Sequence, residues 1–344
     1  MSCYAYYRLP HAARCFKIEQ TEGEPIRLTS LAELNGRQGF VVAPFRVTND
    51  EPILLLKPDH VTEMAVQEPR STVNIAEDIT FDKGKYVSCF EQTSRLLQEG
   101  VFRKVVLARS ASMKNPHTIT PEELFWRACQ CYPRLFIALV AMPDGSYWLT
   151  ATPEILLEGK GREWRTIALA GTMQLQGDEL QGEGESVRWS TKNIQEQRYV
   201  ATYIANCLEG FSLDYKEEGP RTVRAANLVH LRSDFSFCLN DSFRVGLLLN
   251  ELHPTPAVCG LPKQATFDYI IENEHADRQY YSGFMGPLAI DDATHLYVSL
   301  RCMHISDSEY RLYAGGGILK DSLMEQEWQE TEAKMMTMKR IMEN

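Results

Sequence analysis

The sequence predicts an α+β fold, because segments with strand and helix periodicity are mixed and hairpin signals occur between them. Short strand-like segments appear near the amino terminus, most clearly at 39–45 and 53–56. A hairpin signal follows at 134–142 and 147–158, where the turn 143–146 reads Pro-Asp-Gly-Ser. Segments with helical spacing at 81–99 and 321–342 complete the mixture.

The other elements follow from caps, periodicity and glycine content. Residues 1–75 are expected to form short strands separated by turns, and residues 102–108 a further strand. A helix is expected at 120–131, where Thr120 is suited to cap the amino end and Pro121 to occupy the first helical position. The Gly-rich acidic stretch 176–187 predicts a loop. Further helices are predicted at 190–209, 240–251 and 263–273, and further strands at 296–305 and 309–314.

No internal repeat or Gly/Ser linker marks a domain boundary in the 344 residues. One large domain is therefore predicted, with residues 1–75 as a β-rich part of the same globule. The 36 Lys and Arg residues against 46 Asp and Glu residues give a formal net charge of −10, without a long basic run. This charge argues against nucleic acid or an anionic membrane as a partner. It is compatible with a small anionic substrate, because a few local cations can reverse the field inside a cleft.

The sequence also lacks signals for a membrane span or for export. The longest apolar runs, such as 136–142, are far too short to cross a bilayer. The amino terminus lacks the charged-then-apolar layout of a signal peptide. The nine cysteines are scattered without CxxC spacing, which indicates reduced thiols. We therefore expect a cytoplasmic protein.

Lys104 is the first of three places where charged residues interrupt an apolar pattern. Alternate residues of a strand share a face, so Lys104 lies with Val106 and Ala108. Desolvation there would make the neutral amine accessible, as a general base requires. The alternative is a lysine at a strand end whose ammonium group reaches water, which is the commoner situation for an isolated lysine.

Glu196 is the second place. In the predicted helix 190–209 it lies within roughly 40° of Val200, and closer still to Tyr203 and Cys207, which belong to the apolar stripe. A carboxylate directed at a core must be paired, protonated or bound to a metal. The alternative is a first-turn glutamate stabilised by the helix dipole, and the residues alone leave both open.

The last helix is the third place. Glu327, Glu330 and Lys334 project within roughly 60° of one another and flank an apolar arc that includes Trp328 and Met335. Two hard carboxylate ligands with open water positions would suit Mg2+, which readily shares its shell with an anionic substrate. Glu330 and Lys334 also match the ordinary exposed i,i+4 ion pair, and spacing alone favours that alternative.

Six linear motifs and one arginine resemble those of a single enzyme family. They are the segments 104–109 (KVVLAR), 152–154 (TPE), 168–172 (ALAGT), 253–260 (HPTPAVCG), 314–318 (AGGGI) and 327–331 (EWQET), together with Arg301 in 298–302 (VSLRC). Their order and spacing are similar to those of the isochorismate, salicylate, anthranilate and aminodeoxychorismate synthases. The resemblance implies two packed antiparallel sheets with helices outside, and it makes residues 76–344 a chorismate-binding catalytic domain.

Matched residue by residue, the resemblance implies a catalytic pair, a metal site and a substrate pocket. Lys104 corresponds to the base that activates water, and Glu154 to the general acid. Glu196 and Glu330 correspond to carboxylate ligands of Mg2+, and Glu327 to a residue that reaches the metal through water. The expected substrate-binding residues are Thr172, His230, Ala257, Tyr281, Arg301, Gly315 and Lys334. From its apolar setting alone, His230 could equally be a core histidine.

The implied reaction is the Mg2+-dependent conversion of chorismate to isochorismate, in menaquinone or siderophore biosynthesis. Ala170 stands where aminodeoxychorismate synthases place a nucleophilic lysine, and Lys104 favours water over the ammonia that anthranilate synthases use. No glutamine amidotransferase subunit is therefore expected, and we expect a monomer. Two alternatives stay open, namely a salicylate synthase, which also eliminates pyruvate, and a catalytically silent relative that only binds chorismate.

The chain departs from the family's pattern at two places. Thr152 stands where the family usually has serine. Around the first metal helix the family commonly shows Lys-Asp-Arg-x-Glu-His, whereas segment 192–197 reads KNIQEQ. Glu196 is retained but its neighbours differ, which puts the support of this carboxylate by surrounding residues in doubt.

Overall fold

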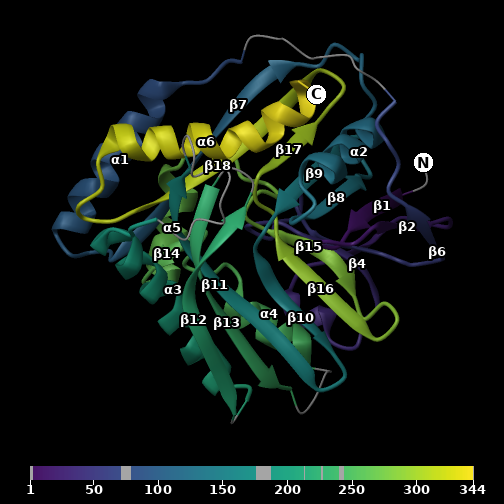
Figure 1. Cartoon of the computed structure of the whole chain (residues 1–344), viewed down its shortest axis with the longest axis horizontal. Helices are drawn as coiled ribbons and strands as arrows, with labels where there is room; N and C mark the ends of the chain where they lie inside the picture. Colours follow the sequence, from purple (N-terminus) through teal and green to yellow (C-terminus); the bar gives the residue numbers. More distant parts are fainter. Residues whose placement is uncertain are drawn as a thin grey trace.

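The computed structural model describes residues 3–70, 79–175, 187–212, 214–225, 228–239 and 244–343. Within these residues, antiparallel strands form two nine-stranded sheets, which we call sheet A and sheet B (Figure 1). In order across the sheet, sheet A contains β14 (Gly260–Leu261), β7 (Lys104–Lys114), β18 (Glu309–Ile318), β17 (Cys302–Ile305), β9 (Tyr147–Thr152), β8 (Phe136–Ala141), β1 (Cys3–Arg8), β2 (Arg14–Gln20) and β6 (His60–Ala65). Sheet B contains β12 (Tyr215–Ala225), β13 (Leu228–Cys238), β11 (Glu163–Gln174), β10 (Ile155–Lys160), β16 (Ala293–Val298), β15 (Phe284–Leu288), β4 (Gly39–Ala43), β5 (Ile53–Leu56) and β3 (Ile26–Leu28).

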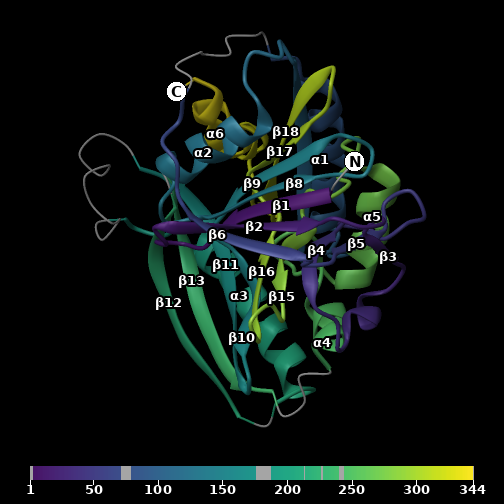
Figure 2. The same ribbon diagram turned by 90° about the vertical axis from the view of Figure 1, so that its right-hand side faces the viewer.

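The helices pack on the outer faces of the two sheets (Figures 1 and 2). Sheet B is covered by α3 (Thr191–Glu209), α4 (Val245–Leu252) and the 3-10 helix η1 (Leu31–Leu34). Sheet A is covered by α2 (Pro121–Cys131) and α6 (Met324–Glu343), while α1 (Lys83–Gln98) and α5 (Lys263–Asn273) pack beside β7 and β14. Asp82, Thr120 and Ser190 cap α1, α2 and α3 by accepting a backbone N–H three residues further on.

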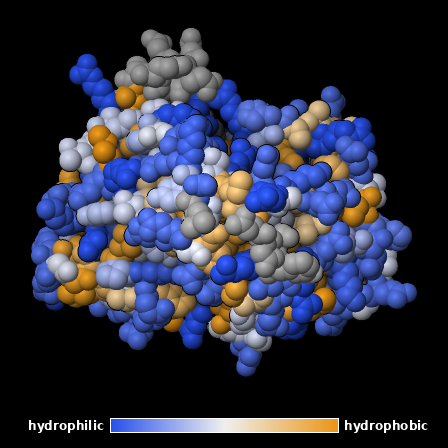
Figure 3. Space-filling view, turned by 90° about the horizontal axis from the view of Figure 1, so that it is seen from below, coloured by the Kyte–Doolittle hydropathy of each residue, from blue (hydrophilic) through white to orange (hydrophobic). Residues whose placement is uncertain are grey.

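An aromatic core joins the inner faces of the two sheets. Phe136 of β8 stacks on Tyr297 of β16, with ring centroids 4.3 Å apart and planes 4° from parallel. Tyr7 of β1 stacks on Phe16 of β2, and its ring centroid lies 6.3 Å from that of Phe136. None of the helices among the described residues is long and apolar enough to cross a membrane. Hydrophilic residues cover most of the face in Figure 3, and hydrophobic residues occur there in small groups.

The predicted α+β fold with two packed antiparallel sheets is confirmed. The residues before 66 supply β1, β2 and β6 to sheet A and β3, β4 and β5 to sheet B. The predicted loop 176–187 lies outside the described residues except for residue 187, and so does the first part of the predicted helix 240–251, whose described part is α4.

Two strand predictions are wrong, because each predicted strand is in fact two strands that belong to different sheets. Segment 147–158 is divided between β9 in sheet A and β10 in sheet B, and segment 296–305 between β16 in sheet B and β17 in sheet A. Pro153 ends the first strand because it has no N–H to donate to a neighbour. The second segment is broken between Val298 and Cys302, where Arg301 has a φ of 46°, which no regular strand contains.

We expect Phe136→Ala to lower the free energy of unfolding by about 3–5 kcal/mol, because it leaves a cavity where the two sheets meet. Urea unfolding followed by circular dichroism measures this change. Val61→Ala, at an exposed position of β6, is the matched control and should change the value by less than about 0.5 kcal/mol. A loss below about 1 kcal/mol for Phe136→Ala would contradict the central role of this ring pair.

Candidate active site

Two passages of the chain from one sheet to the other lie side by side, and they carry Glu154 and Arg301. The first joins β9 to β10 through Pro153 and Glu154, and the second joins β16 to β17 through residues 299–301. The N–H of Val298 donates to the Glu154 carbonyl oxygen at 2.9 Å, and the N–H of Ala151 donates to the Arg301 carbonyl oxygen at 3.1 Å. These two bonds bring an acidic and a basic residue to one point between the sheets.

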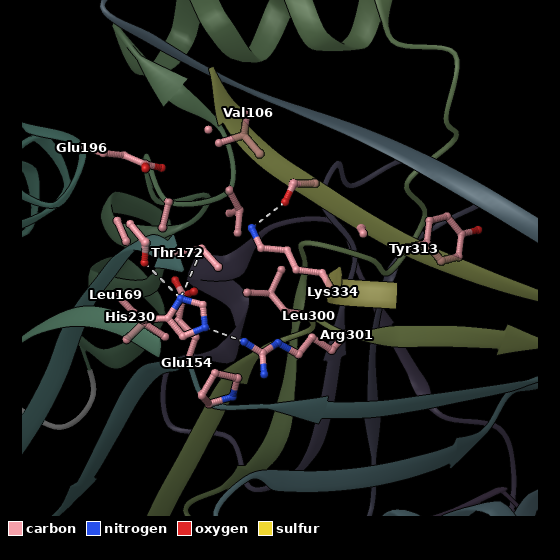
Figure 4. Close-up of a pocket in the computed structure, with 18 of the residues that line it drawn as sticks. Val106, Glu154, Leu169, Thr172, Glu196, His230, Leu300, Arg301, Tyr313 and Lys334 are labelled. Carbon is pink, nitrogen blue, oxygen red and sulfur yellow. Dashed lines mark hydrogen bonds between the residues drawn. The ribbon is translucent and has the colours of Figure 1, made fainter. Parts of the chain in front are cut away.

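His230 of β13 orients the Arg301 guanidinium. Arg301 Nη2 lies 2.5 Å from His230 Nε2, and Arg301 Nη1 donates to the Ala225 carbonyl oxygen at 3.2 Å (Figure 4). His230 Nδ1 lies 3.1 Å from the Gly171 carbonyl oxygen. A carbonyl oxygen only accepts, so Nδ1 carries the ring proton and Nε2 accepts from Arg301. Burial, and then the charges of Arg301 and Lys334, lower the pKa of His230 well below its usual value, so the ring stays neutral.

Gly171 makes this arrangement possible. It forms a bulge in β11 between Ala170 and Thr172, with a φ of 75° that a glycine adopts readily. A Cβ at Gly171 would also lie 3.2 Å from the backbone oxygen of Asn193 in α3. Thr172 follows the bulge, and its hydroxyl lies 3.3 Å from His230 Nδ1.

Glu154 is suited to donate a proton. Burial raises the pKa of Glu154 to about 8, although the charges of Lys104, Lys334 and Arg301 act in the opposite direction. The carboxyl group is therefore mainly protonated at neutral pH, and three cations would stabilise the carboxylate that forms when the proton leaves. This combination is what a general acid working near pH 7 requires.

Lys104 forms a buried ion pair with Glu196. Lys104 is fully buried at the start of β7, so the alternative of an ammonium group that reaches water is wrong. Its Nζ lies 2.9 Å from Glu196 Oε1. A Cβ at Gly317 of β18 would lie 2.1 Å from that oxygen and 2.8 Å from Lys104 Cε, so this pair occupies the space that a side chain there would need. Burial by itself would raise the pKa of Glu196, but Lys104, with Lys192 and Lys334, lowers it overall.

Helix α6 presents two further glutamates to the other side of the same strand. A Cβ at Gly316 would lie 3.3 Å from Glu327 Oε2 and 3.8 Å from Glu330 Oε1. Glu330 pairs with Lys334 at 2.8 Å, and Lys334 Nζ also donates to the Gly315 carbonyl oxygen at 2.8 Å. Both side chains of this pair are about four-fifths buried, so it is not the ordinary exposed pair that spacing alone favoured.

Each of the three predicted metal carboxylates is paired with a lysine. Besides the pairs Lys104–Glu196 and Lys334–Glu330, Lys192 of α3 forms an ion pair with Glu327. Within the described ranges of the chain, no three His, Cys, Asp or Glu side chains are gathered closely enough to hold one metal ion. In this arrangement lysines therefore compensate the charge of the carboxylates.

The donor chemistry nevertheless fits a hard divalent cation. Glu327 Oε2 is buried and has no hydrogen-bond partner. Burial, and then the neighbouring charge of Glu330, raises the pKa of Glu327, while Lys192 opposes this shift. A cation beside these two carboxylates would remove their repulsion and satisfy the free oxygen. Glu196, across the glycine strand, is the third oxygen donor that the sequence predicts.

The pocket between these groups has a volume of about 60 Å³. All seven predicted substrate-binding residues line it, namely Thr172, His230, Ala257, Tyr281, Arg301, Gly315 and Lys334. Glu154 and Glu196 also line it, whereas Lys104, Glu327 and Glu330 do not form part of its lining. Figure 4 shows Glu154, His230 and Arg301 grouped on one side, and Lys334 near the centre.

Sequence reasoning missed two residues of this site. Tyr313 of β18 lines the pocket and stacks on Tyr281, with centroids 5.4 Å apart. Its position two residues before the glycines 315–317 could have indicated that it lies at the pocket. Lys192 lies one helical turn before Glu196, and this i,i+4 spacing could have indicated a role near the carboxylates. Gln197, one of the departures, is buried and donates from Nε2 to Ser233 Oγ at 2.8 Å, so it supports α3 on sheet B.

Two known proteins with similar sequences are named isochorismate synthases. The isochorismate synthase MenF of Escherichia coli (strain K12) is 30% identical over 264 residues, which cover 76% of this chain and 61% of that protein. The isochorismate synthase DhbC of Bacillus subtilis (strain 168) is 32% identical over 270 residues, which cover 75% of this chain and 67% of that protein. The matched part thus spans less than two thirds of the Escherichia coli protein.

The fold agrees with these matches. The solved structure of MenF, the menaquinone-specific isochorismate synthase from Escherichia coli, superimposes with a TM-score of 0.82 at 23% identity. The superposition covers 99% of this chain and 88% of that one, which shows a common fold. The family described as chorismate binding enzyme matches residues 51–343. Because that match covers most of the sequence, the chain belongs to the family of chorismate binding enzymes.

Proposed function

We propose that this chain is an isochorismate synthase, an isomerase that converts chorismate to isochorismate with Mg2+ as its cofactor. The proposal is carried by two buried groups, namely Glu154, which lines the pocket and is mainly protonated, and Lys104, which pairs with the lining residue Glu196. A protein that only binds chorismate would need neither group. The names of the relatives, at about 30% identity over most of the chain, support the same reaction.

The pocket offers fixed positive charge to a substrate with two carboxylates. Arg301 is held by His230 and by a backbone carbonyl, so its remaining N–H groups are oriented before the substrate arrives. Burial lowers the pKa of Arg301 to about 10, which still leaves it charged at neutral pH. Lys334 supplies a second cation beside Gly315. Orientation in advance reduces the entropy lost on binding.

The proposed reaction exchanges one hydroxyl for another across the ring. Lys104, once it has lost its own proton and become the neutral amine, accepts a proton from the water molecule whose oxygen bonds to C2, and the ring double bonds shift as the C4–O bond breaks. Glu154 donates its proton to the departing hydroxyl, which leaves as water. One water is consumed and one is released, so the product is an isomer of the substrate. A neutral acid and a basic amine are both needed at the same pH.

Mg2+ would be held by Glu196 and Glu330, with Glu327 nearby, and when bound it would neutralise a substrate carboxylate. In support of this site, a buried oxygen of Glu327 has no partner. The product would serve menaquinone or siderophore biosynthesis. In support, one solved structure similar to this chain is described as menaquinone-specific and one relative as vibriobactin-specific.

Product analysis tests the proposed function directly. Purified protein with Mg2+ and chorismate is expected to form isochorismate, detected by liquid chromatography, and a chelator should abolish turnover. Mainly salicylate and pyruvate would identify a salicylate synthase instead. Binding of chorismate without any product would identify a catalytically silent relative.

Glu154→Gln should reduce kcat by roughly 10²–10⁴-fold, because the amide has no proton to give to the leaving hydroxyl. In the unchanged enzyme, the rate should fall as the pH rises through about 8, since the raised pKa of Glu154 keeps it protonated only below that value. Steady-state rates from pH 6 to 10 measure both effects. Glu163→Gln, at an exposed position of β11, is the control and should leave both kcat and its dependence on pH unchanged. A rate that keeps rising above pH 9 would rule out Glu154 as the acid.

Lys192→Met should strengthen metal binding in the absence of substrate by roughly tenfold, because it removes the cation that pairs with Glu327. Calorimetric titration with Mg2+, or electron paramagnetic resonance with Mn2+, measures the affinity without turnover. Lys83→Met removes a partly exposed lysine of α1 that pairs with Glu325 of α6, the helix that carries Glu327, and should have no effect. Equal affinity in both variants would show that Lys192 does not compete with a metal ion.

A further inference from the structure

Arg109 closes the motif that begins at Lys104, but the proposed reaction gives it no part. The two residues are five positions apart on β7, so their side chains point to opposite faces of sheet A. Lys104 shares its face with Ala108, which packs in the core between the two sheets. Arg109 points to the outer face, which α6 covers (Figure 1).

The Arg109 side chain contacts α6 in three ways. Its Nε donates to Thr331 Oγ1 at 2.6 Å, and its Nη2 forms an ion pair with Glu332. The guanidinium carbon Cζ lies 3.8 Å from the ring centroid of Trp328. The Thr331 hydroxyl in turn donates to the Trp328 carbonyl oxygen at 2.7 Å. Arg109 thus binds one turn of the helix, from residue 328 to residue 332.

These contacts are almost completely removed from solvent. Arg109 is 6% exposed, and Thr331 and Trp328 are buried beside it. The Glu332 carboxylate and the face of the Trp328 ring both stabilise the buried positive charge. A buried guanidinium that lost these partners would be strongly unfavourable. The orientation of Arg109 and the position of α6 therefore depend on each other.

The turn that Arg109 binds lies next to the side of α6 that carries the site. At about 100° per residue, Glu327, Glu330 and Lys334 lie within roughly 60° of one another around the helix axis. Thr331 lies about 40° from Glu327, and the other two contacts of Arg109 continue round the helix in the same direction. Arg109 therefore holds the flank of the helix beside the predicted metal carboxylates.

A rotation of α6 about its axis would displace these carboxylates by more than a metal site tolerates. A helix with its side chains has a radius of about 5–6 Å, so a rotation of about 20° moves a carboxylate by about 2 Å. Mg2+ requires near-ideal octahedral geometry with oxygen distances of about 2.0–2.1 Å. A misplacement of about 1 Å in an active site can reduce a rate by about 10²-fold.

We propose that Arg109 is a positioning residue, which fixes the rotation of α6 so that Glu327 and Glu330 can hold one metal ion. Arg109 does not line the pocket, and it acts through the turn of α6 that it binds. The inference rests on the proposed function, because that function assigns Mg2+ to these carboxylates. An arginine suits this role because its fork of donors and its planar face bind at the same time, which a lysine cannot do.

The test measures metal affinity without turnover. Arg109→Lys keeps the positive charge, but it cannot bond to Thr331 and Glu332 together while stacking on Trp328. Electron paramagnetic resonance with Mn2+ measures the affinity of the whole chain. We expect a loss of roughly 10–100-fold, which is usual when the residues that orient metal ligands are removed. Urea unfolding of the same samples reports how much stability the substitution removes.

Arg127→Lys is the matched control. Arg127 of α2 is likewise buried and binds the same helix, but its Nη1 donates to the carbonyl oxygen of Ile341 at 3.2 Å. That contact lies about 16 Å further along α6 than Glu330. The control should therefore lower stability to urea and leave the Mn2+ affinity unchanged. An equal loss of Mn2+ affinity in the two variants, or none in Arg109→Lys, would overturn the proposal.

Thr331→Val tests the same contact from the helix side, and it keeps the proposal testable if Arg109→Lys does not fold. Valine preserves the shape of the side chain but cannot accept the bond from Arg109. We expect a smaller loss of Mn2+ affinity, which adds less than independently to the loss in Arg109→Lys. An unchanged affinity in Thr331→Val would also count against the proposal.

Turnover distinguishes this proposal from the proposed function. If the protein binds Mn2+ but forms no isochorismate, a loss of affinity in Arg109→Lys would end the proposed function and leave the positioning role standing. Formation of isochorismate with equal Mn2+ affinity in all variants would do the reverse. If the original protein neither binds Mn2+ nor forms isochorismate, both are wrong.

Discussion

Two backbone hydrogen bonds fix the relative position of the two passages at which the chain crosses from one sheet to the other, and we call these passages crossovers. The bonds from Val298 to Glu154 and from Ala151 to Arg301 tie together the places where the chain changes sheets. Both crossovers interrupt what would otherwise be long strands, and the interruption directs polar side chains into a space between two apolar faces. The pocket therefore exists because two strands end at the same level, and the aromatic core around Phe136 keeps the sheets in that register.

Charge balance is the second constraint. Burying a carboxylate without a partner is strongly unfavourable, and here Glu196, Glu327 and Glu330 are matched by lysines from β7, α3 and α6. The glycines of β18 are required by the same balance, since any side chain at Gly317 would displace the Lys104–Glu196 pair. A substrate with two negative charges, or a divalent cation, would enter a network in which each charge already has an alternative partner.

Several site residues could be predicted from the sequence, because a charged residue that interrupts an apolar pattern can be recognised without a structure. Lys104 and Glu196 stood out in this way, and both are buried. The motif resemblance added Glu154 and Arg301, which periodicity alone did not mark. Neither method predicted the break at Pro153, because a strand that changes sheets has the same alternation as one that continues. The role of Lys192 was also missed, because its partner Glu327 lies 135 residues away.

The sequence by itself determined the secondary-structure mixture, the family and the chemical character of the site, since local periodicity, turn residues and ordered motifs carry that information. The tertiary structure alone decided which groups meet. It turned Glu330 and Lys334 from a common surface pair into a largely buried one, and it assigned the ring proton of His230 through a contact with Gly171. Those outcomes depend on distances between segments far apart in the chain, and such distances are set by sheet order and packing.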